Sequence, residues 1–181
     1  MKKIIVTLGA LLVFGFVSAQ DKLKSKNEGQ TEVGKWLIEV NTDFGTPMGS
    51  NTGFSYSDTD GNTILNLGAE AGYFVIKDLA VKVGLGYGSM KSDIIDTTIF
   101  SYRIGAKYYI LSQIPVQVDY SGATIKDFDE NPSYLGLQAG YAWFLSSNVS
   151  IEPGLKYNLS LNDKYTDKNT IQLNIGFALH F

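Results

Sequence analysis

Eight charged residues of this sequence stand singly between apolar or aromatic neighbours, and their types could support acid–base chemistry. They are Glu39, Glu70, Lys82, Arg103, Lys107, Asp119, Glu152 and Lys156. Paired carboxylates and amines are the groups that general acid–base catalysis uses. The same groups, nearly balanced in sign, also form the network that fills a narrow polar interior, because buried charges must be paired. We favour the polar network, to which Asp43 could add a further carboxylate.

The remaining candidate for chemistry is His180, the single histidine of the chain. A general base must lie beside its substrate, whereas His180 is the penultimate residue, where we expect a pore-lining or hydrogen-bonded side chain. The sequence has no cysteine, which excludes disulfides, thiol catalysis and Cys-ligated metals. We therefore predict that the protein is not an enzyme and has no catalytic, cofactor-binding or metal-binding residues.

The segments that position these residues alternate between apolar and other residues, which is the period of a β-strand. The alternation covers eight segments, residues 36–44, 65–75, 79–87, 98–110, 114–120, 135–143, 149–161 and 171–181. No charged residue occurs on their apolar face, and many of the 19 glycines fall on the opposite face. A charge-free face indicates contact with lipid, and a polar face rich in glycine indicates a narrow interior filled by long side chains.

The sequence therefore predicts an all-β protein, an eight-stranded antiparallel up-and-down transmembrane β-barrel. The alternative is a secreted lipocalin-type barrel, whose apolar face would point inward around a ligand. Short turns at residues 76–78, 111–113 and 145–148 alternate with longer polar connections at 45–62, 88–97, 121–133 and 162–169. This asymmetry is typical of outer-membrane barrels. Pro153 cannot donate to a strand ladder, so we expect a local irregularity there.

The N-terminal residues have the features of a secretory signal peptide. Lys2 and Lys3 precede an apolar run at residues 4–16, and small residues follow as far as Ala19. We predict export, with signal cleavage after Ala19. Residues 20–34 show no pattern and are predicted to form a mobile periplasmic arm, and residues 35–181 are predicted to form the outer-membrane barrel domain.

The long connections carry the acidic excess of the chain. Their charged residues are Asp58, Asp60, Lys91, Asp93, Asp96, Lys126, Asp127, Asp129, Glu130, Asp163, Lys164, Asp167 and Lys168. We interpret them as solvated loops, or as groups that bind divalent cations shared with lipopolysaccharide phosphates or contact a surface partner, since such cations prefer oxygen ligands. A formal net charge of -3 offers no basic surface for nucleic acid.

The final segment resembles the C-terminal signature of bacterial outer-membrane β-barrels, an alternating strand that ends in phenylalanine: Ile171, Leu173, Ile175, Phe177, Leu179 and Phe181. The pattern over residues 35–181 is similar to the porin-like family of OmpX, OmpW and the OmpA barrel. The resemblance implies the outer membrane of a Gram-negative cell, with lipid and lipopolysaccharide around the barrel, both termini in the periplasm and the long loops outside. It also implies that the barrel assembly machinery recognises Phe181 as an assembly signal.

Two functions fit these predictions. The first is a structural or surface-interaction role, of the adhesion type, in which the polar lumen is largely closed and the long acidic loops meet a partner. The alternative is a narrow porin-like channel for small solutes. The charged network favours the first, because an eight-stranded barrel is only just wide enough to be filled by its own side chains.

Overall fold

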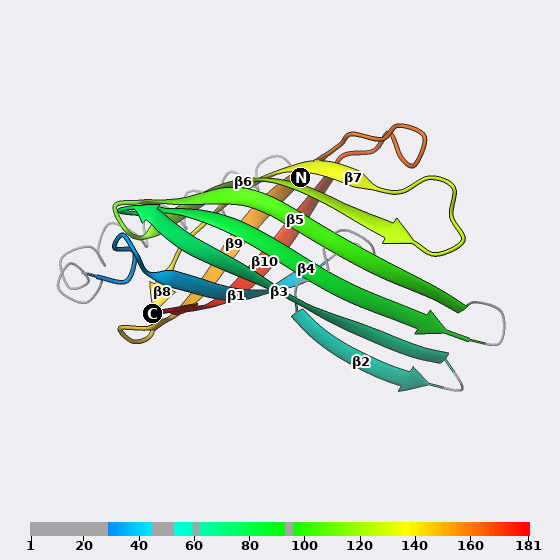
Figure 1. Ribbon diagram of the computed structural model, residues 1–181, viewed down its shortest axis with the longest axis horizontal. Helices are drawn as coiled ribbons and strands as arrows, with labels where there is room; N and C mark the ends of the chain where they lie inside the picture. The colour runs from blue at the N-terminus through cyan, green and yellow to red at the C-terminus, as the bar shows by residue number, and fades with distance from the viewer. Residues whose placement is uncertain (1–28, 45–52, 60–61, 93–95) are drawn as a thin grey trace, which may run out of the picture.

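The computed structural model describes residues 29–44, 53–59, 62–92 and 96–181. Within these ranges no helix is long and apolar enough to cross a membrane. The expected signal peptide and its cleavage position, Ala19, lie outside the described residues. The strands, labelled in Figure 1, are β1 (Trp36–Phe44), β2 (Gly53–Thr59), β3 (Asn62–Ile76), β4 (Leu79–Lys91), β5 (Asp96–Ile110), β6 (Ile114–Ile125), β7 (Ser133–Gly140), β8 (Trp143–Phe144), β9 (Val149–Ser160) and β10 (Thr170–His180).

Eight strands close into an antiparallel barrel, with β8 continuing the line of β7 and β2 standing beside β3. β1 closes the sheet, because it pairs with β10 from Leu37 to Phe44 and with β3 from Trp36 to Glu39. Joining the first strand to the last removes two sheet edges, which is how strands satisfy their backbone polar groups in lipid. The predicted all-β, eight-stranded antiparallel barrel is confirmed.

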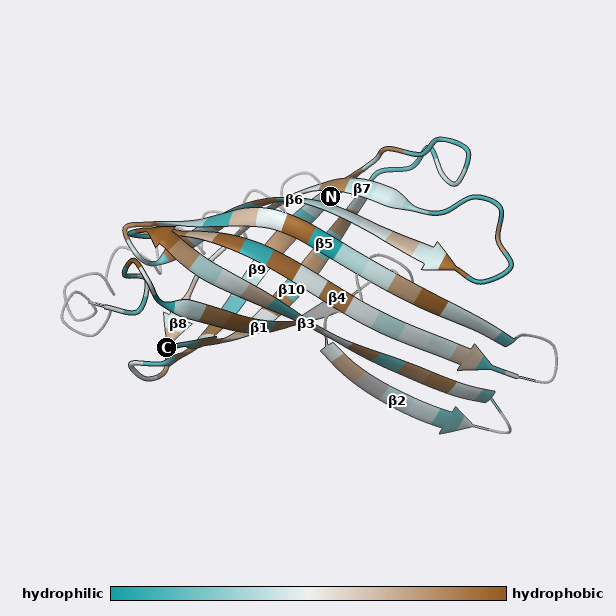
Figure 2. Ribbon diagram, in the orientation of Figure 1, coloured by the Kyte–Doolittle hydropathy of each residue, from teal (hydrophilic) through white to brown (hydrophobic). Residues whose placement is uncertain are grey.

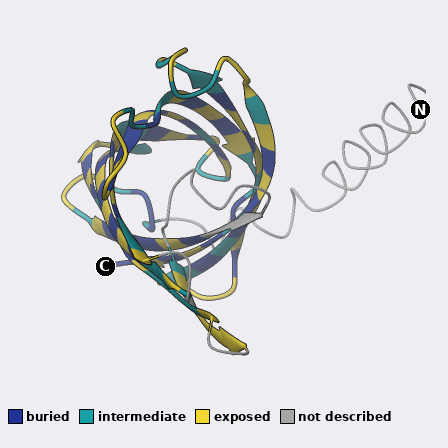
Figure 3. Ribbon diagram, turned by 90° about the vertical axis from the view of Figure 1, so that its right-hand side faces the viewer, coloured by how far each residue is buried: buried dark blue, intermediate teal, exposed yellow. Residues whose placement is uncertain are grey.

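The two faces of each strand differ in chemistry, as the alternation predicted. In β5, Ile104 is 55% exposed on the outside, whereas its neighbour Arg103 is 4% exposed on the inside. The same alternation appears as brown and paler bands along the strands in Figure 2, and as yellow and dark blue bands in the view along the barrel in Figure 3. The large apolar side chains therefore cover the outside, and most charged side chains of the strands lie inside.

The barrel has two unlike ends. We call one the turn end, where tight connections follow β3, β5 and β8 and where residues 29–35 and the C-terminus lie (Figure 1). Positive φ angles at Asp78, Leu111 and Ser112 form two of its turns. The other is the loop end, where residues 126–132 and 161–169 form longer connections and the strands extend to Lys91 and Asp96.

The prediction of a loop over residues 45–62 was wrong for residues 53–59, which form β2. β2 pairs with β3 along its full length, from Gly53 opposite Gly68 to Thr59 opposite Asn62. Residues on both of its faces are exposed, and Phe54 and Tyr56 lie on the same face. Because only two large apolar residues alternate in this Ser- and Thr-rich segment, its strand pattern is weak in the sequence.

The irregularity expected at Pro153 is confirmed. The strand beside it is interrupted at residues 141 and 142, which separate β7 from β8. The amide of Tyr141 donates to the Pro153 carbonyl at 3.0 Å. In an antiparallel pair of this kind residue 153 would return the second hydrogen bond, but proline has no N–H to donate.

Candidate functional site: the lumen network

The structure places all eight charged candidates inside the barrel, and each is at most 4% exposed. They come from six strands, β1, β3, β4, β5, β6 and β9. The side chain of Asp43 lies outside what the structure describes. We call the eight residues the lumen network: Glu39, Glu70, Lys82, Arg103, Lys107, Asp119, Glu152 and Lys156.

The half of the network nearer the loop end begins at Lys156. Its Nζ donates to Asp119 Oδ1 at 2.9 Å, and Arg103 Nε lies 3.5 Å from the same oxygen. Arg103 also donates from NH1 to Glu70 Oε1. A single guanidinium thus stands between two carboxylates from different strands, each of which has a second cation on its other side.

The half nearer the turn end continues the same line. Lys82 Nζ lies 2.8 Å from both Glu70 Oε2 and Glu39 Oε2. Lys107 Nζ follows, 2.7 Å from Glu39 Oε2 and 2.5 Å from Glu152 Oε2. The eight residues therefore form one continuous chain whose charges alternate in sign from Lys156 to Glu152, so every charge has an opposite neighbour.

Uncharged side chains donate further hydrogen bonds to three of the four carboxylates. Asn41 donates to Glu70 Oε1 at 3.1 Å, and Gln117 donates to Asp119 Oδ2 at 2.8 Å. Tyr109 OH donates to Glu152 Oε1 at 2.9 Å. Additional hydrogen bonds of this kind are what make a buried ion pair tolerable in a medium of low dielectric.

Glycines on the inner face provide the space that these long side chains occupy. A Cβ added at Gly84 would lie 2.8 Å from Glu70 Cγ. At Gly136 it would lie 2.7 Å from both Asp119 Oδ1 and Lys156 Cε. Real Cβ atoms do not approach other atoms this closely, so a larger residue at either glycine would displace side chains of the lumen network.

An apolar cluster fills the inside of the turn end, and the sequence interpretation missed it. Leu37, Phe74, Tyr109 and Phe144 are buried there together. They occupy inward positions, in phase with the charged residues and close to the turns, and this phase is the signal that could have identified them. They lie between the charged residues of the lumen network and the tight turns.

His180 belongs to this cluster and is fully buried. Its ring centroid lies 5.3 Å from that of Phe144, and its Nε2 lies 3.0 Å from Ser150 Oγ. Its Nδ1 lies 3.2 Å from the carbonyl oxygen of Gln30. His180 therefore holds the chain before β1 against the barrel, in a position shielded from solvent.

The described part of the arm, residues 29–34, is packed against the turn end, in contrast to the mobile arm expected from the sequence. Gln30 and Thr31 are buried. The Asp78 amide donates to the Thr31 carbonyl at 2.8 Å, and Asp78 Oδ1 accepts hydrogen bonds from Thr31 Oγ1 and Ser112 Oγ. Asp78 thus joins the arm to two turns.

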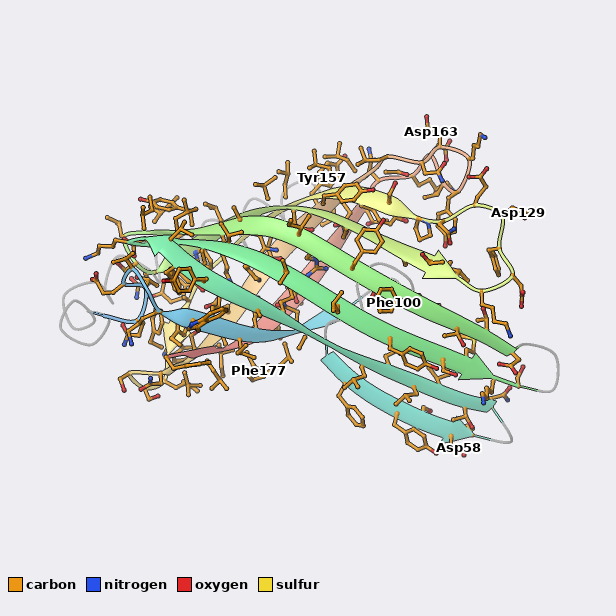
Figure 4. The ribbon with its side chains drawn as sticks, viewed as in Figure 1. Asp58, Phe100, Asp129, Tyr157, Asp163 and Phe177 are labelled. Carbon is orange, nitrogen blue, oxygen red and sulfur yellow. The ribbon has the colours of Figure 1, made fainter. Side chains whose placement is uncertain are left out.

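At the loop end, two of the connections bind each other. Asn162 donates to the Asn131 carbonyl at 2.9 Å, which links the β9–β10 connection to the β6–β7 connection. Tyr165 packs on the inward-facing Ile99 and Ile125, and its partial burial raises the pKa of its phenol. Asp129 and Asp163 project from these connections in Figure 4. No three His, Asp or Glu side chains in the described ranges are grouped as metal ligands.

The remaining sequence prediction concerns Phe181, the proposed assembly signal. Phe181 is 58% exposed, and its backbone exchanges hydrogen bonds with Trp36, at 2.7 Å and 3.0 Å. It therefore lies where the last strand meets the first. An aromatic ring at the outer end of a strand also suits a membrane interface.

The closed ladder, the large apolar side chains on the outer surface and the polar filled interior together define an integral outer-membrane β-barrel. Residues 7–137 match the family model of the outer membrane protein beta-barrel domain, and the chain belongs to this family. The resemblance to small barrels of the OmpX and OmpA type is confirmed, and the family supports an outer-membrane location. No curated protein matches the sequence significantly.

Several solved outer-membrane barrels align with most of this chain. OprG from Pseudomonas aeruginosa is 13% identical over 84% of this chain and 98% of its own, with a TM-score of 0.51. The N-terminal barrel of OprF from the same organism is 16% identical over 82% and 98%, with a TM-score of 0.46. Ail from Yersinia pestis is 14% identical over 82% and 99%, with a TM-score of 0.47. At 13% identity, the similarity to OprG shows the fold alone.

Proposed function

We propose that this protein is a structural, surface-presenting barrel whose lumen is closed by the lumen network and whose loops meet a partner outside the cell. The observation that carries the proposal is the continuous chain of ion pairs between Lys156 and Glu152. Its members are buried and fill a barrel of a size that its own side chains can occupy. A water column through this lumen would have to displace paired charges.

Two further features support a closed lumen rather than a channel. The apolar cluster around Phe74 and Phe144 lies beyond the network at the turn end, together with the Gln30 segment that His180 contacts. At the loop end, Tyr165 packs over Ile99 and Ile125. Side chains from both ends therefore add to the barrier that the ion pairs form.

The proposed surface role depends on the loop end, which we assign to the outside of the cell. Asp58, Asp129 and Asp163 lie there, at separate points of its rim (Figure 4). These carboxylates suit a partner that is cationic or bridged by divalent cations, such as lipopolysaccharide phosphates. In this proposal the chain is exported, its signal peptide is cleaved after Ala19, the barrel assembly machinery recognises Phe181, and the protein catalyses no reaction.

Single-channel recording in a planar bilayer tests the closed lumen. We expect the wild-type protein to show only rare openings, and Arg103→Ala to open more often, because it removes the cation that joins Glu70 to Asp119. Lys164→Ala is the matched control, since it removes an exposed lysine paired with Glu130 at the loop end. Sustained, frequent openings of the wild type would overturn the proposal and establish the narrow channel instead.

A further inference from the structure

The outer surface of the barrel contains a groove of about 610 Å³, at the place where β1 and β3 separate. Val40 of β1 and Phe177 of β10 form one wall. Phe54 of β2, with Leu67 and Ala69 of β3, forms the facing wall, and β4 and β5 extend it. Phe100 and Phe177, both part of the lining, are labelled in Figure 4.

The groove follows from the way the barrel closes. The β1–β3 ladder ends at the pair of Glu39 and Glu70, although β1 continues beside β10 as far as Phe44. Beyond that point β3 pairs with β2, beginning at Gly53 opposite Gly68. A Cβ on Gly53 would lie 2.8 Å from the carbonyl oxygen of Asn41, so the start of β2 packs closely against β1. β1 and β3 diverge beyond this contact.

The chemistry of the lining selects an apolar occupant. Phe54, Leu67, Leu85 and Phe177 are all exposed on the outer face. Among the described residues, the lining offers apolar side chains and backbone apart from Asn41 and the tyrosine hydroxyl, and none of these described lining residues is charged. Because this surface faces hydrocarbon, an empty groove would lose dispersion contacts along both walls. Its volume lies within the roughly 300–1,000 Å³ of small-molecule sites.

The position of the groove identifies the leaflet from which the occupant comes. Phe54, Leu67, Tyr87 and Phe100 are successive partners across four neighbouring strands and form one row on the outer face. Aromatic residues of membrane barrels gather where the hydrocarbon meets the headgroups. The groove runs from this row toward Ala69 and Val40, as an acyl chain does when its headgroup stays at the interface.

We propose that this groove is a binding site for one acyl chain of a membrane lipid in the leaflet at the loop end. The site lies on the outer wall and requires only that the barrel spans a membrane. The result of the conductance experiment therefore has no bearing on this proposal, whichever function that result supports.

Native mass spectrometry of the barrel released from nanodiscs of dimyristoylphosphatidylcholine tests the site. We expect the wild type to keep one lipid under conditions that remove the others. Ala69→Phe should lower the retained lipid roughly tenfold, the change expected when about two methylene groups are displaced from an apolar site. Ala106→Phe is the matched control, because Ala106 lies on the outer face of β5 between Val81 and Val118, away from the groove.

If Ala69→Phe does not fold, a photocrosslinking measurement on the wild type tests the acyl-chain site instead. The bilayer then contains a small fraction of phosphatidylcholine with a photoreactive diazirine in the middle of one chain. We expect crosslinks to concentrate on Leu67 and Leu85 relative to Val81, which is also exposed on the outer face. Equal labelling of these positions, equal retention by both variants, or a lipid-free dimer in the mass spectrum would each overturn the proposal.

Discussion

The inner and outer faces of the barrel wall are formed by the same strands, yet they place different requirements on their side chains. Arg103 and Ile104 are adjacent in β5 and point to opposite faces. The outer face requires apolar surface, and many apolar residues could supply it, because lipid packs against any of them. The inner face requires particular partners, because each buried charge is stable only beside its counter-charge. A substitution on the inner face should therefore change the free energy of unfolding because it leaves a buried partner unpaired. A substitution on the outer face should change it because it alters the contact with lipid.

The largest effect is expected when the inner face loses one charge. Arg103→Ala should lower the free energy of unfolding by ~3–5 kcal/mol, the usual cost of removing one member of a buried pair. Glu70 keeps Lys82 at 2.8 Å and Asp119 keeps Lys156 at 2.9 Å, which places the expected loss toward the lower end of that range. Denaturant unfolding, followed by the mobility of folded and boiled samples in SDS gels, measures the change.

The control for this experiment is a charge that lies outside the lumen. Lys164 pairs with Glu130 at 3.6 Å, and its side chain is largely exposed. Lys164→Ala should change the stability by less than about 1 kcal/mol, as exposed pairs usually do. Equal effects of the two substitutions would remove the distinction between the inner face and the surface.

A smaller effect is expected when the outer face gains a charge. Ile104→Arg, on the lipid side of the same strand, should cost ~2–4 kcal/mol if it lies near the middle of the membrane. Phe128→Arg is the control, because Phe128 is equally exposed but lies in a connection at the loop end. Unfolding in phospholipid vesicles measures both changes. A fully stable Ile104→Arg variant would contradict lipid contact at this face.

The sequence predicts the faces better than it predicts the contacts. Alternation alone assigns Glu39 and Lys107 to the interior, because side chains point to opposite sides at every step along a strand. Their 2.7 Å contact depends on the register of every strand between β1 and β5. That register includes a shift between Phe74 and Ile76, which no periodicity reveals.

The features that the sequence analysis missed depend on tertiary context for the same reason. The turn-end cluster combines Leu37, Phe74 and Phe144 from β1, β3 and β8, which come together only when the barrel closes. β2 forms because β3 extends beyond its pairing with β1 and offers a free edge from Gly68 to Asn62. Neither event is encoded in a single segment.

The smallest effect is expected from a change that alters neither face and affects only the backbone between them. Pro153 is exposed on the outer face of β9, so Pro153→Val keeps that face apolar while supplying an N–H. This N–H would point toward the carbonyl of Tyr141, whose own amide already donates to residue 153 at 3.0 Å. The free energy of unfolding should rise by about 0.5–1.5 kcal/mol, the usual net value of one hydrogen bond. Leu155→Val, on the same face of the same strand, should bring no such gain, and its amide already lies within a regular ladder between Ala139 and Leu173. Denaturant unfolding of the two variants, with amide exchange at residue 153, separates the backbone contribution from that of the side chain. A Pro153→Val protein no more stable than the wild type would mean that the interruption between β7 and β8 has a cause other than the missing donor.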